Sequence, residues 1–179
     1  MAGRIAFQGE LGAYSHQACQ QSRPEFEAVP STTFEEVVDK VARGEVDLGM
    51  LAVENSTYGR VADVHSLLPK SGLHIVDEAF VRVHVNLLGV PGAKVSDVRE
   101  AHGHVVILPQ CAGFLKAHDI RGKVSSDNAR AAREVAEAGD KSRAALASEL
   151  AASIYGLEVL ARHIEDHANN TTRFLVMSR

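Results

Sequence analysis

Cysteine is scarce in this 179-residue chain, and its pattern indicates neither disulfides nor a metal centre. Cys19 and Cys111 lie far apart in the sequence and match no metal-ligand spacing. We therefore expect two free thiols in a reducing compartment, most simply as small buried apolar residues. Residues 1–4 carry neither an apolar signal core nor a small-residue cleavage site, so the expected location is the cytoplasm.

Long apolar runs and an excess of positive charge are also missing. Charged residues or glycines interrupt every apolar stretch well before the roughly 20 residues that a membrane-spanning helix needs, so we expect no membrane insertion. Lys and Arg number 19 against 23 Asp and Glu, and the arginines are scattered rather than gathered in a stripe. Nucleic acid is therefore not an expected partner.

Several motifs of cofactor and nucleophile chemistry do not occur. The sequence has no G-x-G-x-x-G pattern of dinucleotide sites, no Gly-Lys-Ser/Thr of nucleotide phosphate sites and no G-x-S-x-G elbow of serine hydrolases. Two histidine pairs, His163 with His167 and His102 with His104, supply fewer ligands than the three or four that a stable metal site requires. We expect neither a metal nor a cofactor.

The first half of the chain has the pattern of an α/β fold. Apolar runs alternate with amphipathic stretches, and Ser31 to Glu36 resembles a helix-capping box. The predicted order is a strand at 4–7, a helix at 13–21, a strand at 25–29, a helix from the capping box to Gly44, and a strand at 47–53. Such an order favours a mainly parallel sheet with flanking helices, whose ligands bind beyond the carboxyl ends of the strands.

A β-rich stretch at 74–90 is long enough to carry the chain into a second lobe of similar construction. The predicted elements there are a strand at 104–108, a helix at 110–118, a strand at 123–125, a helix opened by Asp127 and closed by Gly139, a strand at 144–147 and a helix at 149–155 ended by Gly156. A final strand at 172–177 is expected to return to the first lobe. Residues 1–75 and 165–179 would then form one lobe, and residues 76–164 the other.

Three polar segments follow or open predicted strands. Gly9-x-x-Gly12 lies between a strand and a helix, where a plain tight turn and an anion site are about equally expected. Glu54-Asn55-Ser56 ends a very apolar strand, which slightly favours a pocket over solvent. Asn169 to Phe174 places a hydroxyl, a guanidinium and an aromatic ring in succession, either as a carboxylate-binding site or as a surface strand edge.

Taken in this order, these segments resemble the catalytic domain of prephenate dehydratases over essentially the whole chain. The resemblance rests on Gly9 to Ser15, Glu54-Asn55-Ser56, Gly59-Arg60-Val61, Gln110-Cys111, Asp127-Asn128-Ala129, Tyr155-Gly156-Leu157 and Asn170-x-Thr172-Arg173-Phe174. The sequence departs from the family pattern at Gly103, Ile107, Pro109 and Asn128, which affects expectations for the second lobe. The family commonly continues into a phenylalanine-sensing regulatory domain, whereas we expect only the catalytic domain here.

The resemblance implies an enzyme, a carbon-oxygen lyase of phenylalanine biosynthesis that converts prephenate to phenylpyruvate without a cofactor. It also implies two lobes like those of type 2 periplasmic solute-binding proteins, a substrate cleft between them and usually a homodimer. Thr172 would be the hydrogen-bond donor or general acid at the leaving hydroxyl, Arg173 the carboxylate anchor, and Phe174 an apolar wall or cleft-packing residue. The remaining expected site residues are Glu54, Asn55 and Ser56 as catalytic polar lining and Asn170, Tyr14, Ser15, Gly12 and His104 as substrate contacts.

Three other functions remain open at the level of sequence. The substrate could be arogenate, or the enzyme could be a prephenate decarboxylase that retains the hydroxyl group. Thr172-Arg173-Phe174 argues against the second. A two-lobed protein could also bind an anionic solute as a sensor without turning it over.

Overall fold

The computed structural model describes residues 3–179, which divide into two compact units. Among the described residues, unit 1 contains residues 3–10, 14–83 and 169–179, and unit 2 contains residues 11–13 and 84–168. The chain leaves unit 1 after Val83, because the strand that begins at His74 continues through Arg82 beside the last strand. It returns before Asn169, so the final strand belongs to unit 1.

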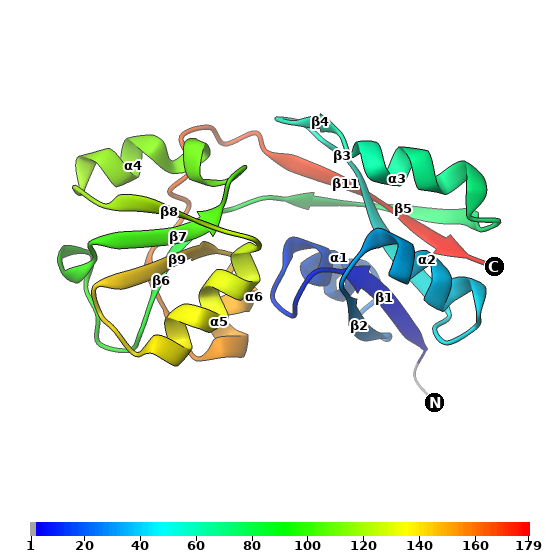
Figure 1. The fold of residues 1–179 in the computed structure, drawn as a ribbon, viewed down its shortest axis with the longest axis horizontal. Coiled ribbons are helices and arrows are strands. Elements are labelled where there is room, and N and C mark those ends of the chain that lie inside the picture. Colours follow the sequence, from blue (N-terminus) through cyan, green and yellow to red (C-terminus); the bar gives the residue numbers. More distant parts are fainter. Residues whose placement is uncertain (1–2) are drawn as a thin grey trace. The chain divides into compact units, whose positions relative to one another are not determined.

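Unit 1 is built on a six-stranded sheet in the order β2-β1-β3-β11-β5, with β4 paired to β3 (Figure 1). Its strands are β1 (Arg4–Gln8), β2 (Glu27–Ser31), β3 (Leu48–Asn55), β4 (Gly59–Arg60), β5 (His74–Arg82) and β11 (Thr171–Ser178). Its helices are α1 (Tyr14–Ser22), α2 (Phe34–Ala42), α3 (Ala62–Leu67) and the 3-10 turn η1 (Leu68–Lys70). Ala18 and Cys19 of α1 pack in one core cluster and the valines of α2 and α3 in another, so the helices cover opposite faces.

Unit 2 is built on a five-stranded sheet in the order β10-β6-β9-β7-β8. Its strands are β6 (Asn86–Gly89), β7 (Glu100–His104), β8 (Arg121–Ser125), β9 (Arg143–Ala147) and β10 (Glu158–Ala161). Its helices are α4 (Ala112–Ala117), α5 (Asn128–Ala138), α6 (Glu149–Tyr155) and the 3-10 turns η2 (Val95–Asp97) and η3 (Leu108–Cys111). Helices α5 and α6 pack an alanine-rich surface against β6 and β9.

The α/β class with two sheets and flanking helices is confirmed, but the expectation of mainly parallel sheets needs correction. Parallel pairing joins β1 to β2 and β3, and β7 to β8 and β9. Strands β11, β5, β6 and β10 pair antiparallel with their neighbours, and the short β4 pairs antiparallel with β3. In sequence, β5 and β6 flank one passage of the chain between units, and β10 and β11 flank the other. No short β-α-β crossover therefore joins these four strands to the strands that they pair with.

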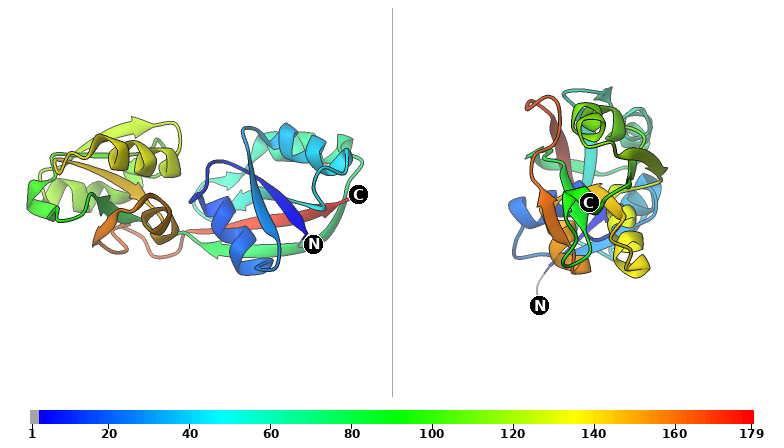
Figure 2. Two further views of the ribbon diagram at one scale, coloured as in Figure 1. Left: turned by 90° about the horizontal axis from the view of Figure 1, so that it is seen from below. Right: turned by 90° about the vertical axis from the view of Figure 1, so that its left-hand side faces the viewer.

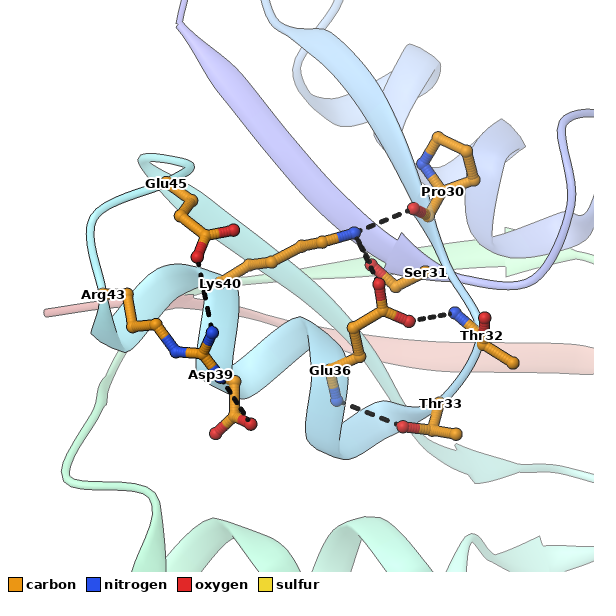
Figure 3. A network of polar contacts seen from close by, with 9 residues as sticks. All are labelled: Pro30, Ser31, Thr32, Thr33, Glu36, Asp39, Lys40, Arg43 and Glu45. Carbon is orange, nitrogen blue, oxygen red and sulfur yellow. Dashed lines mark hydrogen bonds and ion pairs between the residues drawn. The ribbon is translucent and has the colours of Figure 1, made fainter.

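Helix capping was predicted well. The side chain of Thr33 accepts from Glu36 N over 3.1 Å, and Glu36 Oε2 accepts from Thr32 N over 2.6 Å, so the start of α2 has the expected capping interactions (Figure 3). Lys40 Nζ adds contacts of 2.9 Å to Glu36 Oε1 and 3.1 Å to Pro30 O, which fasten α2 to β2. Helix α5 has Asp127 as its N-cap and Gly139 as its C-cap, as the sequence indicated.

One predicted strand is displaced. The apolar run 104–108 was expected to be extended, but β7 covers Glu100–His104 and a 3-10 turn begins at Leu108. The buried residues of β7, Ala101 and Gly103, are small, which allows the strand to pack closely between its parallel neighbours β8 and β9. A β-carbon at Gly103 would lie 3.1 Å from Leu146 Cβ, so apolarity alone did not reveal this central strand.

Both cysteines are free and buried, in agreement with the expectation from their spacing. Burial raises the pKa of each thiol to about 12, which leaves them unreactive at neutral pH. Across residues 3–179, every helix falls short of the length and apolar character that a membrane span requires.

Candidate functional site

The polar ends of β3 and β11 lie side by side in unit 1. The antiparallel register places Thr172 opposite Asn55 and Arg173 opposite Glu54. A register shift follows between Arg173 and Phe174, so the polar ends are offset from the apolar parts of the two strands. Two segments more than a hundred residues apart in sequence therefore form one polar junction, which we call the Asn55–Thr172 junction.

Asn55 organises this junction through all of its amide atoms. Its Oδ1 accepts from Thr57 N over 2.9 Å and from Tyr58 N over 3.1 Å, which shapes the turn between β3 and β4. Its Nδ2 donates to Asn170 Oδ1 over 2.6 Å and to Thr172 Oγ1 over 2.9 Å. Because the two backbone N–H groups require an oxygen, the orientation of the amide is fixed and its nitrogen faces Thr172.

Thr172 is half-buried, and its hydroxyl oxygen accepts from Asn55. Within residues 3–179, the hydroxyl hydrogen of Thr172 meets no acceptor at hydrogen-bonding distance. The bond from Asn55 uses an oxygen lone pair and leaves the O–H group able to donate. The hydroxyl group of Thr172 therefore keeps a hydrogen that it can donate.

Ser56 and Asn170 hold the junction together. Ser56 Oγ donates to Asn169 O over 2.7 Å and accepts from Thr171 N over 2.9 Å, while Ser56 N donates to Thr171 O. Asn170 is 3% exposed, and its Oδ1 receives the short bond from Asn55. These contacts support a positioning role for both residues, since their polar atoms bind neighbouring protein groups.

Arg173 lies between two carboxylates. Its Nε and Nη2 contact Glu78 Oε2 at 2.9 and 2.8 Å, and its Nη1 lies 3.8 Å from Glu54 Oε2. The three side chains remain close to half exposed, so water screens these pairs. The guanidinium thus has the geometry of a carboxylate-binding group, and a ligand carboxylate would have to exchange with Glu78.

Phe174 follows directly and is buried in the core of unit 1, with 1% of its surface exposed. It packs in the same cluster as Phe7, Met50 and Val81. This burial gives Phe174 a packing role in the core of unit 1, whereas the sequence had suggested a place at the substrate cleft. The ring anchors the strand that carries Thr172 and Arg173.

The glycine-containing segment after β1 has a steric explanation. Gly12 has φ +95°, and a β-carbon there would lie 2.9 Å from Ala151 Cα of α6. Its carbonyl accepts from Ser148 Oγ over 2.7 Å, and Leu11 O accepts from Tyr155 Oη over 2.6 Å. Of the two interpretations left open, the close turn thus has direct support, because only glycine fits this approach to α6.

Tyr14 and Ser15 begin α1 and are half-buried. The next residue, His16, turns inward and stacks on Phe7 with ring centroids 5.3 Å apart. Burial lowers the pKa of His16, so its ring is neutral at physiological pH. Ser15 and His16 therefore point to different surroundings, as expected for neighbours on a helix.

His104 ends β7 in unit 2 and is half-buried. Its backbone N donates to Asn128 Oδ1 over 2.8 Å, and its Nδ1 accepts from Val106 N over 3.3 Å. The accepting Nδ1 leaves Nε2 to carry the ring proton. Asn128, one of the departures from the family pattern, thus fixes the backbone beside an expected substrate contact.

The histidine pairs show no metal-binding arrangement. Residues 163–167 are not helical, and His163 stacks on His84 with ring centroids 3.9 Å apart. His84 Nδ1 contacts Glu165 Oε1 at 2.9 Å. In the described part of the chain, no three His, Cys, Asp or Glu side chains converge as metal ligands would.

Sequence reasoning missed Glu78, Asn128 and Ser148 as partners of the expected site residues. Glu78 belongs to β5, whose register against β11 cannot be read from the sequence. Ser148 was recognisable as a helix N-cap, and its side chain accepts from Ala151 N. Its second contact, to Gly12 O, depends on the tertiary fold.

Comparisons with known proteins identify relatives of this chain. The model of the family described as prephenate dehydratase matches residues 5–179. A bifunctional N-acyl-homoserine lactone acylase/prephenate dehydratase of Komagataeibacter europaeus is 47% identical over 98% of this chain and 62% of its own length. An arogenate dehydratase/prephenate dehydratase of Arabidopsis thaliana is 41% identical over 98% of this chain and 45% of its own length.

Among solved structures, the prephenate dehydratase of Arthrobacter aurescens in complex with L-Phe superimposes with a TM-score of 0.90. It is 28% identical, and the match covers 98% of this chain and 60% of that one. The chain therefore spans about half to two thirds of the length of the relatives that it matches.

Proposed function

Because this chain belongs to the prephenate dehydratase family, we propose that it converts prephenate to phenylpyruvate. The prephenate dianion and one proton yield the phenylpyruvate anion, carbon dioxide and water. The ring carboxylate leaves as carbon dioxide, and its bonding electrons enter the ring as the hydroxyl group departs. The product ring is aromatic, which supplies the driving force, so the reaction needs no electron-accepting cofactor.

The observation that carries this proposal is the hydrogen bond from Asn55 Nδ2 to Thr172 Oγ1. The departing oxygen gains negative charge as its bond to the ring lengthens, and a fixed donor at that oxygen lowers the barrier. Thr172 supplies such a donor because Asn55 occupies a lone pair and leaves the hydroxyl hydrogen available. A threonine hydroxyl is a very weak acid, so we assign it hydrogen-bond donation during a concerted cleavage rather than prior proton transfer.

Arg173 is assigned as the anchor for a substrate carboxylate. Its Nε and Nη2 already bind a carboxylate oxygen, that of Glu78. A planar guanidinium can clasp a carboxylate through two hydrogen bonds. On binding, the substrate takes the place of Glu78, and Glu54 stays beside the guanidinium. Tyr14, Ser15, Gly12 and His104 are retained as proposed substrate contacts.

The finer features of the proposal concern substrate, assembly and location. Arogenate has an ammonium group where prephenate has a keto group, and relatives with both names match this chain. We propose prephenate as the preferred substrate, with a homodimer as the working assembly and the cytoplasm as the location. Two unreactive buried thiols fit a reducing compartment.

A direct assay tests this proposal. The purified chain is incubated separately with prephenate and with arogenate, and phenylpyruvate or phenylalanine is quantified by ultraviolet absorbance and chromatography. We expect phenylpyruvate to form faster than phenylalanine. Calorimetric binding of prephenate with no product over hours would instead indicate a sensor, and a product that retains the ring hydroxyl would indicate a decarboxylase.

A further inference from the structure

Arg60 lies on the short strand β4, directly opposite Glu54 of β3. On the other side of β3, Glu54 faces Arg173 of β11. Directly facing residues of antiparallel strands point their side chains to the same face of a sheet. Arg60, Glu54 and Arg173 therefore share one face of the sheet in unit 1, across the strands β4, β3 and β11 (Figure 1).

The charges on this face alternate in sign. Arg173 Nη1 lies 3.8 Å from Glu54 Oε2, and the same guanidinium binds Glu78 of β5, the strand at the rim of the sheet beyond β11 (Figure 2). Arg60 is exposed, and within residues 3–179 its guanidinium takes part in no hydrogen bond or ion pair. Of these four side chains, Arg60 is the one whose charge is unpaired.

We propose that Arg60 makes the site selective for prephenate over arogenate, an inference that rests on the proposed function. An anchor on the ring carboxylate would stabilise the group that has to leave as carbon dioxide, so Arg173 holds the side-chain carboxylate, which the product retains. When this carboxylate replaces Glu78, the guanidinium of Arg173 lies between it and Glu54. The two negative charges repel each other, and the positive charge of Arg60, opposite Glu54, offsets the repulsion.

The two substrates differ in how much they need this offset. Arogenate carries an ammonium group on the carbon next to its side-chain carboxylate, so it brings a positive charge of its own toward Glu54. Prephenate has an uncharged keto group at that carbon, so Arg60 is the cation that balances Glu54. Arg60 therefore determines specificity through Glu54, without contact to the reacting atoms. Because Glu54 and Arg173 are about half exposed, the effect is modest and sensitive to salt.

Steady-state kinetics of Arg60→Gln at low ionic strength test this role. We expect KM for prephenate to rise roughly threefold to fivefold, the size of one exposed charge interaction, with kcat and the melting temperature unchanged. KM for arogenate, or its inhibition constant as a competitor of prephenate, should change less than about twofold, and about 0.5 M salt should remove most of the difference between the substrates.

Two further variants serve as controls. Arg60→Lys keeps the charge and should behave like the parent chain. Arg43→Gln removes an exposed guanidinium that pairs with Asp39 and Glu45 at the end of α2, and it should leave the constants for both substrates within about twofold of the parent values.

A double substitution shows whether Arg60 acts through Glu54. In the Glu54→Gln background there is no charge to offset, so adding Arg60→Gln should leave KM for prephenate at the value of Glu54→Gln alone. A rise of the full size in that background, an equal rise for both substrates, or an unchanged KM for prephenate in Arg60→Gln would overturn the proposal. A parent chain that converts neither substrate would refute the proposed function and this inference with it, whereas prephenate turnover that is independent of Arg60 would refute this inference alone.

Discussion

Asn55 and Thr172 face each other across β3 and β11, and the amide nitrogen of Asn55 donates to the hydroxyl oxygen of Thr172 over 2.9 Å. The direction of this bond matters more than its length. As an acceptor from Asn55, Thr172 keeps its own hydrogen for a ligand. Thr57 N and Tyr58 N hold the amide in this orientation, so the turn after β3 determines the chemistry of a residue on β11.

Reversal of that bond is the first prediction. Asn55→Asp keeps the shape and the acceptor for Thr57 N and Tyr58 N, but it replaces the donor by a carboxylate that draws the Thr172 hydrogen to itself. We expect kcat for prephenate to fall roughly 10²-fold, as for a lost catalytic donor, and the melting temperature to fall as well, because the buried Asn170 Oδ1 also loses its donor. The control is Asn169→Asp, which adds the same charge at a nearby exposed residue and should leave kcat within about twofold. Equal kcat values for the two variants would contradict the proposed bond direction.

Substitution of the anchor is the second prediction. Arg173→Lys keeps the charge but removes the planar two-point contact, which corresponds to the loss of about one charge-assisted hydrogen bond. We expect KM to rise on the order of tenfold, since about 1.4 kcal/mol corresponds to that factor. Steady-state kinetics with prephenate measure this. The control variant is Arg23→Lys, because Arg23 forms an ion pair with Asp77 of β5, the residue before Glu78. This variant should keep the KM of the parent chain. An unchanged KM in Arg173→Lys would show that Arg173 binds no substrate carboxylate.

Much of the fold was predictable because local signals determine it. Helix α5 begins after Asp127 and ends at Gly139, as the capping residues indicated. Helix α6 begins at Glu149 and ends before Gly156, also as predicted. The position of β7 was predicted wrongly because its small residues, Ala101 and Gly103, give no apolar signal in the sequence. Its central place in the sheet follows only from its pairing with β8 and β9. Strand β10 was missed because its pairing with β6 is remote in sequence.

The candidate site was predictable residue by residue but not as a set of contacts. The motifs containing Asn55 and Thr172 were recognisable separately, while their hydrogen bond depends on the register of β3 against β11. The contact of Glu78 with Arg173 depends in the same way on the register of β5. Phe174 illustrates the limit of a motif, since its place beside Arg173 did not reveal that it faces the core.

Gly12→Ala is the third prediction. The new β-carbon would lie 2.9 Å from the backbone of Ala151, at a φ of +95° that L side chains rarely adopt. We expect a loss of roughly 1–3 kcal/mol or more, seen as a melting temperature lower by several degrees. Gly139→Ala is the control, because Gly139 also has positive φ, +63°, but open space around it. If the melting temperature of Gly12→Ala fell no further than that of Gly139→Ala, the close approach of Gly12 to Ala151 of α6 would be contradicted.

The fourth prediction concerns pH. Burial alone would raise the pKa of Glu165, but hydrogen bonds from His84 and Val85 N outweigh it and hold the pKa below its ordinary value. A carboxyl with a lowered folded pKa stabilises the fold above its unfolded pKa, about 4.3, and this stabilisation is lost as the pH falls through the folded pKa. Glu165→Gln should therefore melt several degrees lower than the parent chain at pH 7. The gap should narrow below about pH 4.

Thermal melts from pH 3 to pH 8 measure this gap. Glu137→Gln, which alters an exposed ion pair with Arg133, should show little difference from the parent chain at any pH. A gap for Glu165→Gln that stays constant or widens in acid would exclude the proposed linkage.

The measurement that tests the account most directly is kcat for prephenate in Thr172→Val, compared with Thr172→Ser. Valine keeps the β-branched shape in the strand but has no hydroxyl, whereas serine keeps the hydroxyl. We predict that kcat falls roughly 10²-fold or more in the valine variant, with KM within a few-fold of the parent value. The serine variant should keep most of the activity. A valine variant with the kcat of the parent chain would contradict the assignment of Thr172 as donor to the departing oxygen.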